Sequence, residues 1–438
     1  MKNIKKSYFI IFGLIVLAVV CFSTSYAIFS NTKEEHGKLN IVAGNLNYKI
    51  ESSELDSDSV TVPANTSKEI RIKLTSLNEV SSKYELYYIL DKTNDKVSVG
   101  YSKDTKDSVL GTVEANKNKI ITIVIRNDSD TDSKVSFKVI GGLINNELAL
   151  KDGNSLNQEV EPYRLLSKAI LEDNKLITAK PTLTTSSNNT SDASGLYSST
   201  DTNTGEPTYY FRGNVENNYV NFAGQTWRIV RINEDGTVRL IMQDGINNNT
   251  NYHFNSNYTN YNNYTYMYYT NSQVKSTLEN WYQTNIGGNN NLAGKVASGN
   301  YYCEQAKAKY GDDATSESAT MTTYNKYTPD FKCITDGNNK GVVNASVGLL
   351  SYDEVVYAGG YYGQNNSNYY LYNSAIYWWT MSPAGFESGY SSVWVVSTAG
   401  NIGNGDVGTA YAVRAVLNLT ANTQIIGNGT SSNPYKIS

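Results

Sequence analysis

Between residues 38 and 140 the sequence repeats one pattern, in which apolar and polar residues alternate over short runs. In residues 69–74, for example, Ile70, Ile72 and Leu74 alternate with charged residues. The same scheme recurs in residues 83–90, 119–126 and 134–140, with polar turn clusters between the runs. A period of two places one face of a strand in a core and the other in solvent. Several such strands in one stretch predict an all-β sandwich over residues 31–150.

The N-terminus carries the features of an export signal. Lys2, Lys5 and Lys6 precede an apolar run over residues 8–22, and Ser25-Tyr26-Ala27 places small residues where a signal peptidase reads the chain. We therefore expect an exported protein, in which residues 1–27 are a signal peptide or, if they are not removed, a single-pass membrane anchor. The localisation that follows is extracellular or at the cell surface.

Composition limits the classes of partner. The formal net charge is −4, and no basic run occurs beyond the first six residues, so we expect no nucleic-acid partner. Only 18% of residues are charged while 36 are Tyr, so Tyr, Asn, Ser and Thr must cover much of the surface. Antibody-type binding surfaces use this mixture. An AT-rich genome would give the same bias, and the sequence leaves both explanations open.

Two further segments connect the domains that we expect. Apolar residues recur at helical intervals over residues 160–177, which predicts an amphipathic helix that closes the first domain within a connector at residues 151–180. Residues 181–194 are mostly Ser, Thr and Asn and are predicted to form a flexible tether. A second domain would then span residues 195–438.

Local patterns in this second domain predict a mixed α+β architecture. Residues 227–232 and 237–242 indicate a hairpin around an Asp-Gly turn. Residues 270–282 predict a helix, and Ser351-Tyr352-Asp353-Glu354 has the form of a capping box that begins another. The Asn- and Tyr-rich residues 247–271 show no stable period and are expected to form a long surface loop or, alternatively, a ligand platform.

The stretch from 377 to 419 is the predicted binding region. Residues 392–398 and 412–419 are strand-like, and Arg414 and Asn418 are expected on the solvent face of the second run. The glycine-rich residues between these runs are expected to be loop. Of the Trp residues, Trp227, Trp379 and Trp394 are expected in the core and Trp378 is expected to face outward. The residues predicted to contact a ligand are Phe386, Glu387, Tyr390, Asn401, Asn404, Asp406 and Tyr411.

Two resemblances extend these predictions. Residues 24–30 (TSYAIFS) and 39–46 (LNIVAGNL) resemble the start of the camelysin and biofilm-fibre family of Gram-positive bacteria. This resemblance implies cleavage after Ala27, a jelly-roll-like sandwich and possible self-assembly through the N-terminal domain. A proteolytic role linked to some relatives is not carried over, because the chain has only His36 and His253 and no HExxH motif.

The C-terminal domain carries the broader resemblance. Its ordered motifs resemble an uncharacterised family of exported bacterial proteins, with Ala415 where that family usually has Pro. The quoted motifs are YYFRG (209–213), NNYV (217–220), WRIVRIN (227–233), DEVVYAGG (353–360), WTMSP (379–383), VRAVLNL (413–419) and the closing GNGT and NPY. That family is more distantly similar to the C-type-lectin-like fold of formylglycine-generating enzymes and retroelement variable receptors. The fold class we expect is therefore multidomain and β-rich, with a C-type-lectin-like C-terminal domain.

The chemistry that the second resemblance implies is only partly supported by the residues. Formylglycine-generating enzymes hold copper with a close pair of cysteines, whereas Cys303 and Cys333 are well separated and fit a structural disulfide in an exported domain. We find no catalytic motif and predict no catalytic residue, no enzyme activity and no cofactor. Calcium remains open, because Glu387, Asn401 and Asn404 lie near Asp406 in the sequence, although no lectin-type calcium motif is present.

These observations predict an exported cell-surface binding or adhesion protein that presents a C-type-lectin-like head on a β-sandwich stalk. Its partner would be a glycan, a wall polymer or a surface protein. The alternative is a structural subunit of an extracellular matrix or fibre, and a less favoured alternative is a formylglycine-generating-type oxidase.

Overall fold

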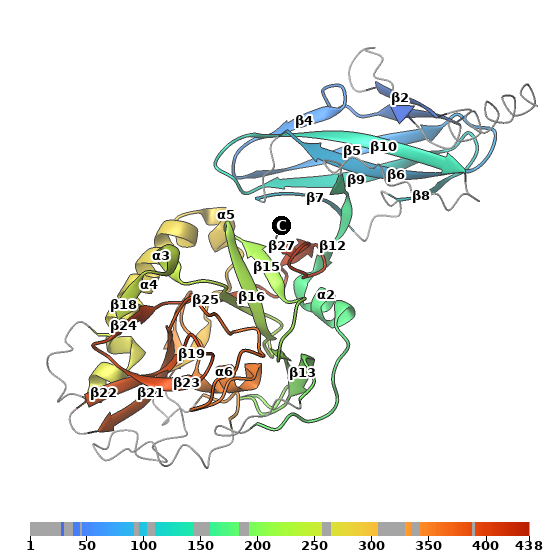
Figure 1. Cartoon of the computed structure of the whole chain (residues 1–438). Coiled ribbons are helices and arrows are strands. Elements are labelled where there is room, and N and C mark those ends of the chain that lie inside the picture. Colours follow the sequence, from blue (N-terminus) through green and yellow to red (C-terminus); the bar gives the residue numbers. More distant parts are fainter. Residues whose placement is uncertain are drawn as a thin grey trace, which may run out of the picture. The chain divides into compact units, whose positions relative to one another are not determined.

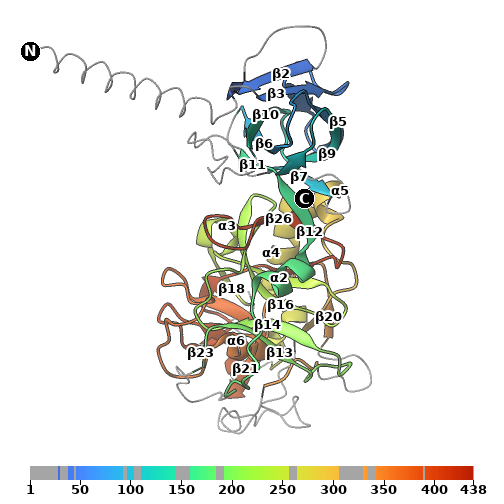
Figure 2. The same ribbon diagram turned by 90° about the vertical axis from the view of Figure 1, so that its right-hand side faces the viewer.

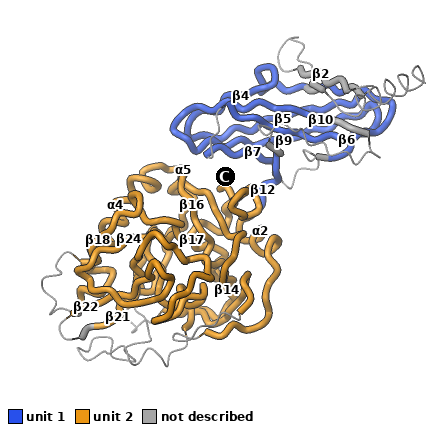
Figure 3. The backbone as a smooth tube through the Cα atoms, in the orientation of Figure 1, with its two compact units in different colours: residues 1–164, 438 blue, residues 165–437 orange. Residues whose placement is uncertain are grey.

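A computed structural model of the chain shows two compact units that divide between Arg164 and Leu165 (Figure 3). The residues that it describes are 28–29, 38–43, 46–91, 96–102, 110–143, 158–183, 192–255, 264–304, 329–333, 342–387 and 390–437. Each unit has its own hydrophobic core and is described separately below.

The first unit consists of two sheets (Figure 1). The strands of one sheet are, in spatial order, β1 (Ile28–Phe29), β2 (Lys38–Ala43), β3 (Leu46–Glu51), β5 (Thr66–Ser76), β9 (Asn118–Asn127), β7 (Val97–Ser102) and β12 (Glu161–Leu165). Those of the other are β11 (Gln158–Glu159), β6 (Ser82–Leu90), β10 (Ser133–Leu143) and β4 (Ser59–Val62), with β8 (Leu110–Val113) beside β6. All four runs that the sequence predicted as strands are strands.

Period-two alternation explains how the two sheets enclose one core. Along β5, Ile70, Ile72 and Leu74 are buried while the residues between them are exposed. They share the core with Leu86 of β6 and Val139 of β10, which come from the other sheet. The predicted β-sandwich is therefore confirmed for this unit.

The second unit contains a larger mixed sheet. Its strands are, in order, β26 (Gln424–Ile426), β27 (Tyr435–Ile437), β15 (Tyr219–Phe222), β16 (Gln225–Ile232), β14 (Thr208–Arg212) and β13 (Gly195–Ser199), and β17 (Val238–Met242) lies between β16 and β25 (Val416–Leu419). The predicted hairpin is present as β16 and β17. Strand β27 pairs in parallel with β15 and lies inside this sheet, between β26 and β15 (Figure 1). Figure 2 shows β16 and β14 of the same sheet as neighbours.

A second sheet of this unit carries the stretch in which binding residues were predicted. Its strands are, in order, β18 (Asn251–His253), β24 (Ala410–Ala412), β21 (Trp378–Glu387), β22 (Tyr390–Val396) and β23 (Ile402–Asp406), and a separate pair is formed by β19 (Tyr301–Cys303) and β20 (Val342–Asn344). The presence of β23 corrects the expectation of a loop over residues 399–411. Its backbone pairs with β22 from Ser392–Asp406 to Val396–Ile402, and this pairing tolerates the glycines.

The helices of the second unit follow their capping residues. The larger helical segments are α2 (Leu166–Asp173), α4 (Gln273–Tyr282) and α6 (Tyr352–Ala358), with short turns at α3 (Ile246–Asn249), η1 (Tyr264–Met267), η2 (Tyr269–Asn271), η3 (Gln283–Gly287) and α5 (Asn290–Ala293). Ser351 and Glu354 form the predicted capping box of α6, and Gly359 ends that helix with a φ of 116°. The cap of α4 is Ser272, two residues after the start expected from the sequence.

The described residues of the region predicted as one long loop contain regular secondary structure. Residues 247–271 include β18, η1 and η2, while residues 256–263 lie outside the described part of the chain. Strand β18 pairs with β24, because Asn251 and His253 lie opposite Ala412 and Ala410. The expectation of one long surface loop is therefore wrong for the described residues.

The predicted connector at residues 151–180 is divided between the two units, and its helix belongs to the second. Leu166, Ala169 and Ile170 of α2 are buried in the core of that unit, so this helix does not close the first domain. It is also shorter than predicted, because residues 161–165 form β12.

The predicted tether also has both of its described ends on the second unit. Arg212 donates to the carbonyl of Thr182 at one end and pairs with Asp192 at the other. Residues 184–191, between these attachments, lie outside the described part of the chain.

Two expectations about burial near the second core are also wrong. Arg414 and Asn418 are 1% and 3% exposed, so the run that ends at Leu419 is buried on both faces. Trp378 is 1% exposed, because its ring packs under the Arg414 guanidinium at 4.9 Å. Trp227, Trp379 and Trp394 are fully buried, as predicted.

Within the described residues, no helix has the length and hydrophobicity that crossing a membrane requires. The apolar N-terminal residues 8–27 lie outside the described part of the chain.

Candidate ligand-binding cleft

A hairpin turn in the second unit buries an acidic side chain. Gly236 donates its amide to the carbonyl of Asn233, and Thr237 closes the loop by donating its amide and hydroxyl to Oδ1 of Asp235. Gly236 has a φ of 80°, which glycine adopts without strain. Residues at hairpin tips are usually solvated, yet the Glu234 side chain is only 8% exposed. The turn therefore directs a carboxylate into the protein.

Two arginines from the same hairpin share a second buried carboxylate. Arg231 of β16 and Arg239 of β17 both pair with Oε1 of Glu354, and the distance from Arg231 Nε is 3.4 Å. Arg231 also lies 3.5 Å from Oε2 of Glu234. All of these side chains are at most 8% exposed, so the pairs are poorly screened by water.

The ion pairs among Glu354, Arg231 and Arg239 set the charge state of these three side chains. Burial alone would raise the pKa of the Glu354 carboxyl, but Arg239 and Arg231 reverse this effect and hold the pKa below its usual value. Burial lowers the pKa of Arg231, and neighbouring Arg239 lowers it further. Glu354 therefore carries a negative charge that both guanidinium groups require.

These groups border a cleft of about 240 Å³. Its lining comes from the β16–β17 hairpin, from β25 and from two loops, and polar side chains predominate. The lining residues are Thr204, Glu206, Arg231, Asn233, Glu234, Asp235, Thr237, Arg239, Gly299, Asn300, Tyr301 and Asn418. Such a lining suits a ligand with many hydrogen-bonding groups better than an apolar one.

Two buried acceptor atoms in this lining have no donor. Neither Oε1 of Glu234 nor Oδ1 of Asn233 accepts a hydrogen bond from any described residue. Buried polar atoms are nearly always paired, and leaving one unpaired costs free energy. Both atoms are buried beside the cleft and keep a hydrogen-bonding capacity that no described residue uses.

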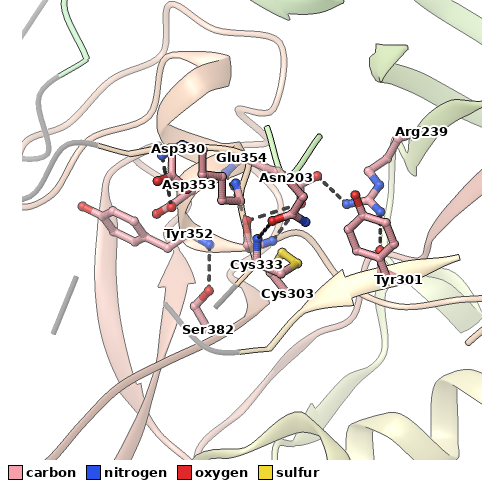
Figure 4. The surroundings of a disulfide bond; sticks show 12 residues. Asn203, Arg239, Tyr301, Cys303, Asp330, Cys333, Tyr352, Asp353, Glu354 and Ser382 are labelled. Atoms are coloured by element: carbon pink, nitrogen blue, oxygen red, sulfur yellow. Dashed lines mark hydrogen bonds and ion pairs between the residues drawn. A yellow bond between two sulfur atoms is a disulfide. The ribbon is translucent and has the colours of Figure 1, made fainter. Parts of the chain in front are cut away.

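A smaller pocket adjoins the arginines from the side of the disulfide. It is lined by Arg231, Arg239 and Glu354 together with the segment that contains Phe331 and Lys332. Figure 4 shows the Cys303–Cys333 disulfide beside Glu354, with the amide of Cys333 bonded to Oδ1 of Asn203. The predicted disulfide is confirmed, and it fixes residues 329–333 next to the arginine pair.

The structure brings some of the predicted ligand residues together, because Ser392, two residues after Tyr390, pairs with Asp406. Asn404 and Asp406 are exposed on one face of β23, and Tyr390 is 48% exposed at the start of β22. Asn401 lies before the other end of β23, where it bonds to Asn365. Phe386 and Glu387 end β21, and their side chains lie outside the described part of the structure.

Tyr411 has a packing role that the sequence did not suggest. Its ring packs edge-on against Trp379, with the centroids 4.8 Å apart, and stacks on Tyr377 at 5.4 Å. A Cβ atom on Gly405 would approach the Tyr411 ring to 2.6 Å, so the ring covers the opposite face of β23 from Asn404. Tyr411 therefore does not join Asn404 and Asp406 on one surface.

The same spacing argues against one calcium site in this region. Asn401 and Asp406 stand at opposite ends of β23, a separation of about 16 Å at the rise of an extended strand, whereas calcium ligands lie roughly 2.3 to 2.6 Å from the ion. Among the described residues, no group of three or more His, Cys, Asp and Glu side chains could hold a metal ion.

Sequence reasoning did not identify the cleft, although a signal was present. Arg231 and Arg239 interrupt strands that are otherwise buried, and Glu354 lies in a helix whose seven residues are all buried. Charged residues at such positions require partners. Their pairing could not be deduced, because Glu354 lies 115 residues from Arg239 in the chain.

Comparison with known families finds one match. Residues 235–421 are similar to a domain of unknown function, DUF6273. The matched segment contains Arg239 and Asn418 of the cleft, and Glu354 beside it, but begins after Glu234. No curated protein and no solved structure matches the chain significantly.

Proposed function

We propose that this chain is an exported cell-surface binding protein of a Gram-positive bacterium, in which the second unit binds a glycan in the cleft between the β16–β17 hairpin and residues 299–301. The first unit would act as the stalk. The signal-like residues 1–27 support export.

The cleft is the observation that carries this proposal. Eleven of its lining residues have polar side chains, and Glu234 and Asn233 each retain an acceptor atom without a described donor. Sugars carry dense hydroxyl groups, which bind to carboxylates, amides and hydroxyls of this kind. The arginines and Glu354 satisfy one another, so the cluster shapes the cleft and does not leave an isolated acid or base for catalysis.

The likeness of the second unit to the C-type-lectin-like fold remains part of the proposal. Its support is the set of ordered motifs, the parallel pairing of the last strand, β27, with β15, and the presence of α4 and α6 in a unit with a mixed sheet. The oxidase alternative is disfavoured, since Cys303 and Cys333 are bonded to each other and present no thiolate for copper.

The fibre-subunit alternative has one observation in its favour. Leu77, Val80 and Ile120 of the first unit are each more than half exposed. Ile120 pairs with Lys73 near the end of β5, and Leu77 and Val80 follow that strand, so these residues gather at one end of the sheet. Filaments of the purified protein in electron micrographs would favour this alternative.

A binding assay on the exported full-length protein tests the main proposal. Purified wall glycan is titrated against the native protein and against Thr204→Trp, which places an indole at the exposed rim of the cleft. Thr284→Trp, on an exposed position outside the cleft, is the matched control. We expect binding to be lost only in Thr204→Trp. Equal binding of wall glycan by both variants would show that the glycan does not bind in the cleft.

A further inference from the structure

We propose that the sugar unit bound in this cleft carries a free, protonated amino group, which pairs with Glu234. This inference rests on the proposed function, because it names the ligand class of the same cleft.

Two acceptor atoms at the cleft lack hydrogen-bond donors from the described residues. Oε1 of Glu234 and Oδ1 of Asn233 are adjacent along the hairpin turn, and both lack a donor among the described residues. Among the described residues, the Glu234 carboxylate is paired only through Oε2, which lies 3.5 Å from Arg231. A ligand that completes this site must therefore supply hydrogen-bond donors, and an ammonium group supplies three.

The arginines cannot serve a ligand anion in the same way. Arg239 donates to three acceptors, which are Oδ1 of Asn418, Oε1 of Glu354 and the carbonyl of Tyr301. Arg231 is held between Glu354 and Glu234, with a further contact to Thr208. A phosphate or carboxylate would have to displace these internal pairs.

The balance of charge points in the same direction. The lining of the cleft holds two guanidinium groups and three carboxylates, which belong to Glu206, Glu234 and Asp235. Glu354 pairs with both arginines and adds a fourth carboxylate beside this lining. A net negative site in a partly buried environment attracts cations and disfavours anions.

The remaining lining favours a sugar over a peptide amine. Thr204, Asn300 and Asn418 offer hydroxyl and amide groups that both donate and accept, as ring hydroxyls require. Tyr301 provides the one aromatic side chain of the lining. The volume of about 240 Å³ is below the roughly 300 Å³ at which pockets for drug-sized ligands begin, so one sugar unit is a suitable size.

The test compares two soluble oligosaccharides that differ only at nitrogen. A tetramer of glucosamine and a tetramer of N-acetylglucosamine are titrated by calorimetry into the exported full-length protein at pH 6. We expect the glucosamine tetramer to bind at least tenfold more tightly, because acetylation removes the charge and two donors. Equal affinity for the two tetramers would overturn the proposal.

Substitutions test whether Glu234 causes the tighter binding of the glucosamine tetramer. Glu234→Gln keeps the shape of the side chain and should lower affinity for the glucosamine tetramer at least tenfold, whereas Glu216→Gln, at an exposed position outside the cleft, should have no effect. Asn233→Asp is the second variant and should raise that affinity, which keeps the test informative if Glu234→Gln does not fold. Unchanged affinity in Glu234→Gln with an unchanged melting temperature would overturn the role of Glu234.

The outcomes separate this inference from the proposed function. If both tetramers bind equally and Thr204→Trp abolishes binding, the cleft is a sugar site but the amine is not recognised. If neither tetramer binds while wall glycan binds in a manner sensitive to Thr204→Trp, the ligand class is wrong and the cleft is retained. Binding that is insensitive to Thr204→Trp contradicts both.

Discussion

Nη1 of Arg239 donates to Oε1 of Glu354, and this bond joins strand β17 to helix α6 across 115 residues of chain. Glu354 has a second function in the same place, since its side chain completes the capping box of α6 by accepting from the amide of Ser351. One carboxylate therefore links the helix start, the hairpin and the wall of the cleft.

Glu354→Gln should strongly destabilise the protein. The change would leave Arg231 and Arg239 buried without a carboxylate between them, and loss of one partner in a buried ion pair costs about 3 to 5 kcal/mol. Chemical denaturation of the exported protein, followed through the Trp fluorescence of the second unit, measures this loss.

Glu304→Gln provides the matched control for that substitution. Glu304 is 6% exposed, but its contacts are the amide and hydroxyl of Thr270, which the glutamine oxygen can still accept. We expect its free energy of unfolding to change little at neutral pH. If both variants lose a similar free energy of unfolding, the loss comes from replacing a buried glutamate. It would then not come from breaking the arginine pairs of Glu354.

Acid should destabilise the second unit through Glu354. The pKa of this carboxyl is below its ordinary value of 4.5 in the folded protein, so its contribution is present above that pH and is lost as pH falls through the folded pKa. Burial raises the pKa of Glu304, so that group has the opposite sign and favours folding at low pH. Melting temperatures of the native protein and Glu304→Gln between pH 3 and 7 should show a steeper acid loss in the variant.

Tyr390 and Tyr411 should respond differently to truncation. Tyr411→Ala removes the ring that packs on Trp379 and Tyr377, and a lost aromatic pair costs about 0.5 to 1.5 kcal/mol beyond the buried area. Tyr390→Ala changes a side chain that is 48% exposed and should leave the melting temperature nearly unaltered. If the two variants melt alike, the packing assigned to Tyr411 is wrong.

Reduction of the Cys303–Cys333 disulfide should lower stability. Closing a loop of this length contributes about 3 to 4 kcal/mol through the entropy of the unfolded chain. The melting temperature of the second unit should fall in dithiothreitol, and a Cys303→Ser, Cys333→Ser double variant should match the reduced protein. An unchanged melting temperature on reduction would contradict this contribution.

Processing after Ala27 can be checked directly. The small residues of Ser25-Tyr26-Ala27 predict a mature chain that begins at Ile28. Intact-mass measurement of protein recovered outside the cell should give that chain. Retention of residues 1–27 would replace the secreted form in the proposal with a membrane-anchored form.

Much of the fold was predictable from local patterns. Alternation identified β5, β6, β9 and β10, and the capping residues identified α6, because these signals arise from residues close together in the chain. The burial of Arg414 was not predictable in this way. Its guanidinium is held by the carbonyls of Met242 and Leu371, which lie 172 and 43 residues away.

The cleft could not be predicted from local patterns either, because its lining residues come together from distant parts of the chain. A glycine-rich segment with exposed polar residues suggested a binding loop, but pairing with β22 makes it the strand β23. The cleft instead forms where the hairpin turn meets residues 204–206 and 299–301. Glu234 was known to lie in a turn, and only the tertiary structure buries its side chain.

The attachment of both ends of residues 181–194 to the second unit bears on how the protein would respond to a protease. A cut between residues 184 and 191 would not release a free head, because α2 and Ile177 remain packed with the strands that follow the cut. The two pieces would separate on a denaturing gel and migrate together under native conditions. Limited proteolysis at this Ser- and Thr-rich segment would thus produce a nicked protein of unchanged native mass.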